Sequence, residues 1–518
     1  MSGETRRKTI LVGGFIIWSA ILWMISYIVY THGFLANDHP NTDMVIELDY
    51  ARYVYETKSF FPKDFVFTTE TRPFLPTFLT AVFYGIFENL RIAFVTSLAL
   101  NALVGSVLVY LLFRNLDCNK MWSFLGMLFF GTMYHVQVFS FDFISNFYVE
   151  FYLCCLLTLL GFFTLRKGWQ YASFLAAFVM GLHSLRALAL LYLPLFLVVL
   201  LFSYYKERRT CFASRCCFLG MGIFFQVAGY AFLKNVLVPL YHLQFQTPEI
   251  MFFPLPPQTV WWDSLREIGN ALDVFPLYPD AIPFGIFWLV VAMIFFFTMQ
   301  YRRAYSWRQA ELLTFCFISG AAAWLASVFC HAPSGRYYTS ICWLVIFIIV
   351  FGFCWLGREG GCKSIFLAGA FFVFGVCSFP AMWMRAYQPD WNQESPYAAV
   401  VRVLQRENVS YAYAPYWEAG PMEARSDFSI RFGFLRSARD LKAGESYTLD
   451  PYLWGTSRRL YEPDTAPQHV AVILDEKGYA ALSVRSQEIL SRGAFLGAVG
   501  KYHIWLFEEN PILLGESF

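Results

Sequence analysis

The segment FLPTFLTAVFYGIF, residues 74–87, decides how the remainder of the chain is threaded through a membrane. It has fourteen residues, follows Pro73 and contains Pro76, whereas a helix needs about 20 mostly apolar residues to cross the hydrocarbon core of a bilayer. The two possibilities place every later loop on opposite sides of the membrane. If the segment crosses, each later loop lies on the side opposite to the one it occupies when the segment stays in the interface. The charges along the rest of the chain decide between the two.

The composition is that of a membrane protein. Of the 518 residues, 58% are hydrophobic and only 15% are charged, and the mean hydropathy is +0.47. Soluble globular domains carry about 25% charged residues, so this chain has too little polar surface for water. The net charge of +2, without a basic run, predicts no nucleic-acid partner. The twelve cysteines include no CxxC pair, so we expect neither a zinc site nor a disulfide framework.

Positive charge determines the number of crossings. Lys and Arg near the ends of spans stay in the cytoplasm, so Arg6, Arg7 and Lys8 predict a cytoplasmic N-terminus, and the basic loop 205–215 is expected on the same side. An even number of spans must then separate the two. Leaving out 74–87 gives six spans, and including it gives seven, so we expect 74–87 to lie in the outer interface and eleven segments to cross. The expected spans are residues 9–30, 91–113, 121–139, 143–165, 169–185, 187–204, 216–233, 283–300, 310–330, 338–356 and 364–384.

The chain after the last span has a different character. Residues 385–518 carry charges at ordinary density, and three stretches have the pattern of strands: 410–416, 469–476 and 501–509. Residues 395–407, SPYAAVVRVLQRE, have helical spacing after a Ser-Pro start. The tail is therefore expected to form a small α/β domain.

These features together predict the architecture. We expect a polytopic α-helical membrane domain over residues 1–384, with about eleven transmembrane helices and interfacial helices in its first outer loop. An extracytoplasmic α/β domain over residues 385–518 would follow. The first apolar segment lacks a cleavage site and is expected to remain as an anchor. Nothing indicates a eukaryotic host, so the expected location is the bacterial cytoplasmic membrane.

The first outer loop contains an unusual number of acids. Residues 37–56, NDHPNTDMVIELDYARYVYE, place five carboxylates close to the expected membrane surface. Residues 42–58 have helical spacing, and Asp43 would be stabilised by the helix dipole at the N-terminal end. Glu47 shares a face with Asp43 and is a candidate substrate-binding residue. An apolar stripe suited to the membrane interface consists of Met44, Leu48, Ala51 and Tyr55.

The order of these residues resembles a family of membrane enzymes. Asp43 is followed by Ala51-Arg52, then by Phe60-Phe61-Pro62, then by residues 71–94, which contain the short interfacial segment. This order is similar to that of GT-C membrane glycosyltransferases, specifically the polyprenyl-phosphate-sugar-dependent group that includes protein mannosyltransferases and the lipid A aminoarabinose transferase. The similarity continues to about residue 204 and returns around SGRYYTS, residues 334–340. In the family the acid is often followed by Glu, whereas Met44 stands here.

The resemblance implies which carboxylates are catalytic. It assigns to Asp43 the role of base that deprotonates an acceptor hydroxyl, with Asp38 and Glu47 as the alternatives if the alignment is displaced by a few residues. Asp142, in the next outer turn, would order the site. Because hard cations prefer carboxylate ligands, Asp43 and Asp142 would also be the ligands of a divalent cation, Mg²⁺ or Mn²⁺, if one is used. A solvated turn acid is the alternative for Asp142.

The leaving phosphate needs donors that remain charged, and Arg matches phosphate in geometry. The resemblance favours Arg52 and the pair Arg336 and Tyr337, and His331 is a further candidate donor. An interfacial position without a role in phosphate binding is the alternative explanation for His331, and likewise for Arg91, Arg186 and His183. Glu150 lies inside a span, where an acid is costly, so we expect it to face the interior of the helix bundle.

The resemblance implies an integral membrane glycosyltransferase. It would transfer a hexosyl or pentosyl group from a polyprenyl-phosphate-linked donor to a glycan, lipid or protein acceptor at the outer face of the membrane, in cell-envelope synthesis. The main alternative is a polytopic transporter or a lipid or polysaccharide flippase. That class typically shows repeated halves and helices broken near the midplane, and neither is evident in the sequence. A wall-polymer polymerase or ligase is a third alternative.

Overall fold

A computed structural model of the chain describes most of its residues, and its contacts divide the chain into two compact units. Unit 1 comprises Met1–Ile25, Ala99–Val236 and Glu249–Ala386, and unit 2 comprises Ser26–Leu98, Leu237–Pro248 and Tyr387–Phe518. The predicted boundary at residue 384 stays a prediction. The described residues are 3–28, 42–68, 77–128, 146–203, 212–245, 257–272, 306–330, 338–356, 395–441 and 445–514.

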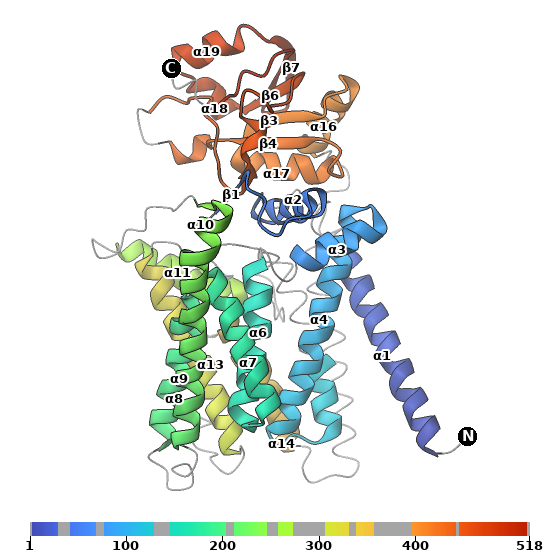
Figure 1. The fold of residues 1–518 in the computed structure, drawn as a ribbon, viewed down its shortest axis with the longest axis vertical. Coiled ribbons are helices and arrows are strands. Elements are labelled where there is room, and N and C mark those ends of the chain that lie inside the picture. The colour runs from blue at the N-terminus through green and yellow to red at the C-terminus, as the bar shows by residue number, and fades with distance from the viewer. Residues whose placement is uncertain are drawn as a thin grey trace. The chain divides into compact units, whose positions relative to one another are not determined.

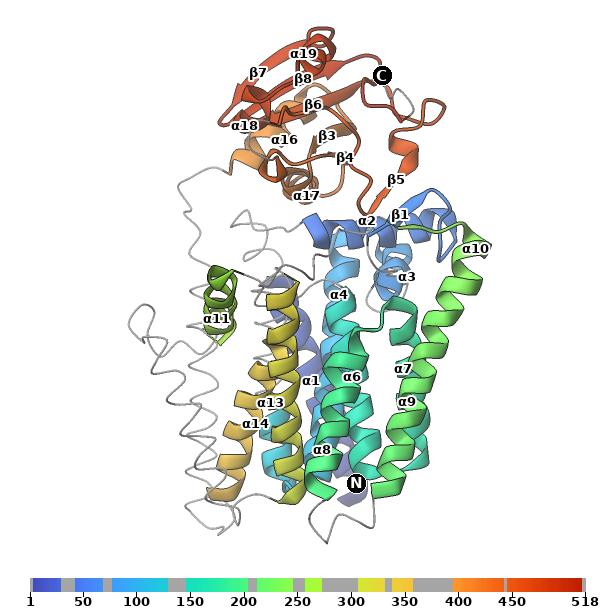
Figure 2. The same ribbon diagram turned by 90° about the vertical axis from the view of Figure 1, so that its left-hand side faces the viewer.

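Unit 1 is helical, and Figures 1 and 2 show α6, α7 and α9 side by side. By length and composition, three helices within the described residues could cross a membrane: Leu90–Asn115, Phe212–Tyr241 and Trp307–Phe329. The predicted spans 283–300 and 364–384 lie outside the described residues, so the expected number of eleven stays a prediction. The helical elements with residues in unit 1 are α1 (Gly3–Ile28), α4 (Leu90–Asn115), α6 (Asn146–Thr164), α7 (Lys167–His183), η2 (Leu188–Tyr192), α8 (Leu193–Ser203), α9 (Phe212–Phe232), η4 (Leu233–Leu237), α11 (Gln258–Leu272), α13 (Trp307–Phe329) and α14 (Thr339–Leu356).

Two glycines allow helices α7 and α9 to approach closely. A Cβ atom added at Gly181 would lie 2.1 Å from the carbonyl oxygen of Gln226, and one at Gly229 would lie 2.1 Å from that of Phe178. Small residues at such contacts are typical of helices that pack within a membrane, where close backbone approach replaces a hydrophobic driving force.

Glu150, the acid predicted to lie inside a span, has a partner in the helix bundle. Its Oε2 lies 2.6 Å from His183 Nε2, and both side chains are buried. The expectation that Glu150 faces the bundle interior is confirmed, and His183 is buried rather than placed at an exposed interface.

Three helix ends that the eleven-span topology places on the cytoplasmic side are in contact at one end of unit 1. Arg215 at the start of α9 donates to Glu311 at the start of α13, with an Nη1–Oε1 distance of 2.8 Å. Arg308 donates to the carbonyl oxygen of Asn115 at the end of α4, at 3.1 Å. Because these helix ends are in contact, they lie on the same side of the bundle, as the charge pattern predicts.

Unit 2 contains the first acidic loop. Helix α2 (Thr42–Thr57) is followed by strand β1 (Phe65–Phe67) and helix α3 (Thr77–Phe87). Strand β1 is the centre of a three-stranded sheet in the order β2-β1-β5, with β2 (Gln244–Phe245) parallel and β5 (Thr456–Ser457) antiparallel to it. Residues from three distant parts of the chain thus form this small sheet. The short helix α10 (Val238–Tyr241) precedes β2.

Helix α3 lies within residues 74–87, the short apolar segment that decides the predicted topology. Its eleven residues span about 16 Å at a rise of about 1.5 Å per residue, roughly half of the hydrocarbon thickness of a bilayer. It packs on α2, where the rings of Tyr55 and Tyr84 meet edge to face at 5.3 Å. Its length favours the predicted interfacial position over a crossing.

The tail of the chain forms an α/β structure with a five-stranded mixed sheet in the order β4-β3-β6-β8-β7. The predicted helix and three predicted strands are confirmed as α16 (Pro396–Arg406), β3 (Tyr411–Pro415), β6 (Val470–Asp475) and β8 (Tyr502–Phe507). Strands β3, β4 and β6 are parallel, and β8 and β7 are antiparallel to their neighbours. The elements of the tail that the sequence did not predict are α17 (Tyr416–Arg425), β4 (Arg431–Leu435), η6 (Ala438–Asp440), β5 (Thr456–Ser457), η7 (Arg458–Leu460), α18 (Glu476–Ala480), α19 (Val484–Leu490) and β7 (Ala494–Val499).

Candidate functional site on helix α2

Helix α2 lies against helix α17 of the tail, both within unit 2. Thr42, the first residue of α2, donates from its hydroxyl to the carbonyl oxygen of Tyr416 at 2.6 Å. Gly420 permits this approach, because a Cβ atom added there would lie only 2.6 Å from Thr42 Cα. The N-terminal turn of α2 is therefore positioned by backbone contacts with α17.

The predicted catalytic acid is part of this contact. Asp43 lies in the first turn of α2 and is half-buried. The phenol of Tyr416 donates to Asp43 Oδ1 at 2.5 Å, which is short, as expected for a hydroxyl bound to a carboxylate. The Tyr416 ring is itself packed edge to face on Phe434 and Tyr452, each at 5.4 Å. A rigid aromatic residue thus orients the carboxylate.

The other candidate acids differ in accessibility. Glu47 is 2% exposed, so it is less accessible to a substrate than Asp43. Asp38 and Asp142 lie outside the described residues. Of the candidate acids, the structure describes Asp43 and Glu47, which both lie on α2.

Arg52 is held by acids from two helices. Its guanidinium pairs with Asp49 of α2, lies 3.1 Å from Glu423 Oε1 of α17, and donates to the carbonyl oxygen of Phe428 at 3.1 Å. Burial lowers the pKa of Arg52, but the neighbouring Asp49 and Glu423 carboxylates raise it by more than burial lowers it, so the net shift of the pKa is upward. Arg52 stays charged and joins α2 to α17.

Glu423 is fully buried in this cluster. Burial raises the pKa of its carboxyl well above the ordinary value, and the charge of Asp49 raises it again, while Arg52 acts in the opposite direction. Burial and the neighbouring Asp49 thus oppose Arg52 at Glu423, and the net direction of its pKa shift is upward.

A second buried acid anchors α17 on its other side. Glu418 is 2% exposed and accepts hydrogen bonds from Tyr502 at 2.6 Å, Tyr397 at 2.7 Å and Arg439 at 2.8 Å. Burial would raise the pKa of Glu418, but these hydroxyls and the charges of Lys501 and Arg439 lower it by more. Tyr397 lies in α16 and Tyr502 in β8, so Glu418 ties α17 to two other elements of the tail.

The structure describes only some of the predicted phosphate donors. Arg336, Tyr337 and His331 lie outside the described residues. Arg91, at the start of α4, pairs with Asp427 just after α17 at 2.8 Å.

The described residues supply only part of the ligand set that a divalent cation would need. In the part of the chain that the structure describes, no group of three or more His, Cys, Asp or Glu side chains is placed to hold a metal ion. The expected second carboxylate, Asp142, lies outside these residues. The described residues alone do not fit Mg²⁺ or Mn²⁺, and we derive no chemical step through a metal.

Sequence reasoning missed the residues of α17. Tyr416, Gly420 and Glu423 recur at i, i+4 and i+7 and form the face that contacts α2. This spacing was a signal for a helix, but Gly420 and Pro421 in its middle normally indicate a turn. The pairing of this face with α2, more than 370 residues away in the chain, has no local signal.

Neither a protein-family model nor a curated protein matches the sequence. Among solved structures, the oligosaccharyltransferase of Archaeoglobus fulgidus, in complex with Zn and sulfate, is similar to this chain with a TM-score of 0.44 and 10% identity, over 92% of this chain and 71% of its own. A likeness at that TM-score carries no argument about the fold or the activity. The function proposed below rests on the residues of this chain.

Proposed function

We propose that this protein is an integral membrane glycosyltransferase of the GT-C type, which transfers a sugar from a polyprenyl-phosphate-linked donor to an acceptor at the outer face of the bacterial cytoplasmic membrane. The observation that carries the proposal is the hydrogen bond from Tyr416 to Asp43, which orients the acid that the resemblance assigns as base. The membrane composition, the short α3 helix and the helix ends that are in contact at one end of unit 1 support the predicted topology. That topology has about eleven spans, a cytoplasmic N-terminus and an extracytoplasmic tail.

In the proposed reaction an acceptor hydroxyl attacks the anomeric carbon of the donor sugar. The bond between that carbon and the phosphate oxygen breaks, and the polyprenyl phosphate leaves with the electron pair. Asp43 accepts the proton of the hydroxyl as the new glycosidic bond forms. Asp43 is preferred over Glu47 because it is the more exposed of the two carboxylates.

The leaving phosphate gains charge as the bond breaks and needs fixed hydrogen-bond donors, of which at least one is positively charged. We propose Arg336, Tyr337 and His331 for this role. For Arg52 the contacts with Asp49 and Glu423 support a structural contribution, since they occupy its guanidinium. Asp142 is proposed to order the acceptor side of the site, and Mg²⁺ or Mn²⁺ binding by Asp43 and Asp142 stays a prediction.

The first prediction tests the acid directly. Asp43→Asn should lower sugar transfer by the purified full-length protein by at least about a hundredfold, because removal of a positioned base costs about 10²–10⁴ in rate. Release of labelled sugar from hexosyl and pentosyl polyprenyl phosphates in proteoliposomes measures it. Asp464→Asn, at an exposed tail position, is the matched control and should retain full turnover.

The outcomes separate the candidate functions. Full turnover of Asp43→Asn would show that the base is elsewhere. Uptake or flipping of a labelled lipid-linked sugar by the wild-type protein, without any transfer, would contradict the transferase and favour the transporter.

A further inference from the structure

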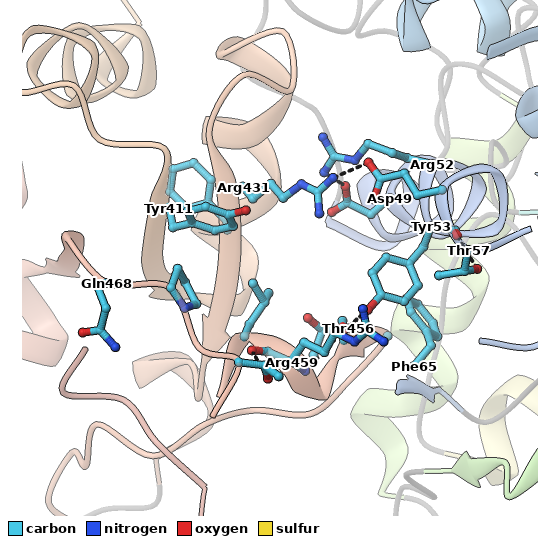
Figure 3. Close-up of a pocket in the computed structure, with 17 residues that line it drawn as sticks. Asp49, Arg52, Tyr53, Thr57, Phe65, Tyr411, Arg431, Thr456, Arg459 and Gln468 are labelled. Atoms are coloured by element: carbon cyan, nitrogen blue, oxygen red, sulfur yellow. Dashed lines mark hydrogen bonds and ion pairs between the residues drawn. The ribbon is translucent and has the colours of Figure 1, made fainter. Parts of the chain in front are cut away.

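Unit 2 contains a cavity of about 460 Å³ on a face of α2 that Asp43 does not share. This volume lies within the range of about 300–1,000 Å³ that is usual for small-molecule sites. Figure 3 shows Tyr53 with Phe65 at one side of the cavity and Tyr411 with Gln468 at the other. Its walls come from α2, β1, the starts of β3 and β4, and the segments 455–460 and 465–468.

Each arginine of the cavity wall is paired with a carboxylate. Arg431 pairs with Glu56, and Arg459 Nε lies 2.7 Å from Asp64 Oδ2. Arg52 pairs with Asp49, as described above. A site for phosphate or another anion needs positive charge that is not already compensated. The charge pattern therefore favours a neutral ligand.

The remaining lining groups combine hydroxyls with aromatic rings. Hydroxyls both donate and accept hydrogen bonds, and rings offer flat apolar faces with a polar edge. A pyranose has the complementary surfaces, with C–H groups on its faces and hydroxyls around its rim. The hydroxyl and amide side chains are those of Tyr53, Thr57, Tyr411, Thr456, Ser457, Thr465 and Gln468, and the rings are those of Tyr53, Phe65, Tyr411 and Phe432. The hydroxyls of Tyr53 and Ser457 are bonded to each other, and Thr57 and Thr465 donate to backbone carbonyl oxygens. These hydroxyls still offer oxygen lone pairs that accept from a sugar hydroxyl.

The position of the cavity along α2 indicates the size of the ligand. Its α2 lining runs from Asp49 to Thr57, about 9 to 21 Å along the helix axis from Asp43 at a rise of about 1.5 Å per residue. A single sugar bound there does not reach Asp43. A chain of several sugars can occupy the cavity and extend toward the carboxylate.

We propose that this cavity binds a neutral oligosaccharide segment of the acceptor, at a distance from the reacting hydroxyl. The proposal rests on the proposed transferase function, which it deepens by naming the acceptor as an elongated neutral glycan. The paired arginines disfavour an anion, and the rings and hydroxyls recognise the sugars.

Binding can be measured without knowing the natural acceptor. The full-length protein in detergent is titrated with neutral gluco-, galacto- and manno-oligosaccharides of one to six units, and binding is followed by saturation-transfer NMR. Inorganic phosphate, glucose 1-phosphate and a neutral hexapeptide serve as competing probes. We expect at least one oligosaccharide series to bind, with affinity that rises with length, and the anions and peptide not to displace it.

Two variants test the location of the site. Tyr411→Ala removes a half-buried ring of the wall, and Thr465→Trp fills the cavity from an exposed position. Each should weaken oligosaccharide binding by about tenfold or more, equivalent to about 1.4 kcal/mol. Ser446→Trp, an exposed residue of the same tail that does not line the cavity, should bind as the wild type does. Unfolding temperatures of all three identify a variant that fails to fold, and Thr465→Trp keeps the test valid if Tyr411→Ala does.

The results distinguish this inference from the proposed function. Asp43→Asn should lose transfer but keep oligosaccharide binding. Absence of binding to every saccharide, unchanged binding by both cavity variants, or stronger binding of the peptide or an anion would overturn the inference while leaving the transferase intact. Binding that both variants abolish, in a protein that transfers no sugar from any donor, would instead refute the transferase and with it the role of the bound glycan as acceptor.

Discussion

Tyr416 contributes only a hydroxyl to Asp43, because its ring is fully engaged elsewhere. The side chain is 4% exposed and packs on Phe434, Tyr452 and Trp417. Replacing it with Phe retains this packing and removes the donor alone. Tyr416 is therefore a positioning residue whose effect on chemistry can be separated from its effect on stability.

For Tyr416→Phe we expect kcat to fall by about tenfold to a hundredfold, since small misplacements of a reacting group cost about 10² in rate. The KM for the donor should not change, because Tyr416 is not proposed to touch it. Steady-state kinetics of the full-length protein provide both values. Tyr447→Phe is the control: its buried phenol donates to the carbonyl oxygen of Arg436 at 2.7 Å, so its loss should lower stability and leave kcat unchanged. Equal effects of the two variants on kcat would exclude a positioning role.

Glu418 predicts an acid-sensitive fold. Its pKa is lower in the folded protein than in the unfolded chain, so the folded state binds the proton less readily. The stability that Glu418 contributes is therefore present above its ordinary pKa of about 4.3 and is lost as the pH falls through the lowered value.

Glu418→Gln should be less stable than the wild type by about 1–3 kcal/mol at pH 7. The difference should shrink as the pH is lowered from 6 to 3.5. Scanning fluorimetry of the full-length protein across this range measures it, with the exposed Glu488→Gln as control. A difference that is constant with pH would mean that the carboxylate of Glu418 is not the titrating group.

At the scale of elements, the contact between α2 and α17 determines where Asp43 lies. The helical span of α2 was predictable from its spacing, and Lys58 ends it with a left-handed φ of +53°. Its surroundings were not predictable. The stripe expected to face the membrane interface includes Leu48 and Ala51, and both are completely buried in the protein. Amphipathic spacing identifies an apolar face but does not tell whether lipid or protein covers it.

The tail shows the same division between local and long-range signals. Strands β3, β6 and β8 follow runs of β-branched and aromatic residues, which is why the sequence predicts them. Strand β7 contains Gly497 with a φ of +126° at a shift in register, and α17 contains Gly420 and Pro421. These glycines and the proline interrupt the regular sequence patterns, so the sequence did not predict β7 and α17. The pairing of Arg52 with Glu423 had no signal in either segment.

Gly420→Ala tests the helix contact. The added methyl group would lie 2.6 Å from Thr42 Cα and 2.8 Å from its hydroxyl oxygen, so the N-terminal turn of α2 must move. We expect a loss of about 1–3 kcal/mol in stability together with lower transfer, since Asp43 moves with Thr42. Gly220→Ala, where an added methyl meets no atom within 4 Å, is the control and should be nearly neutral. Unchanged transfer by a folded Gly420→Ala protein would contradict the coupling of this contact to the site.

At the scale of the whole molecule, the topology depends on the short helix α3. Its sequence predicts that both of its ends lie outside, and this stays a prediction until the sidedness is measured. The charge pattern predicts an even number of spans between the N-terminus and residues 205–215. The contacts of Arg215 and Arg308 place the helix ends that are expected to be cytoplasmic next to one another. The sidedness of the membrane itself does not follow from packing.

Cysteines at Lys63 and Glu88, both exposed and on either side of α3, measure it. In intact cells both Lys63→Cys and Glu88→Cys should react with an impermeant maleimide. The unsubstituted protein gives the background from the natural cysteines, and Lys120→Cys, at the expected cytoplasmic end of α4, should react only after lysis. Labelling of one flanking cysteine without the other would mean that the segment crosses.

Unit 2 has a consequence for how the protein is made. It joins Ser26–Leu98, near the start of the chain, to Tyr387–Phe518, at its other end. Chains fold progressively as they leave the ribosome at about 5–20 residues per second, so α2 emerges long before α17, its packing partner. Arg52 contacts Glu423 and Phe428, which lie 371 and 376 residues further along the chain, so at these rates its partners emerge about 20 to 75 s after it does. A chain that stops before α17 would lack the packing partner of α2, so the position of Asp43 depends on Tyr416, a residue made 373 positions later.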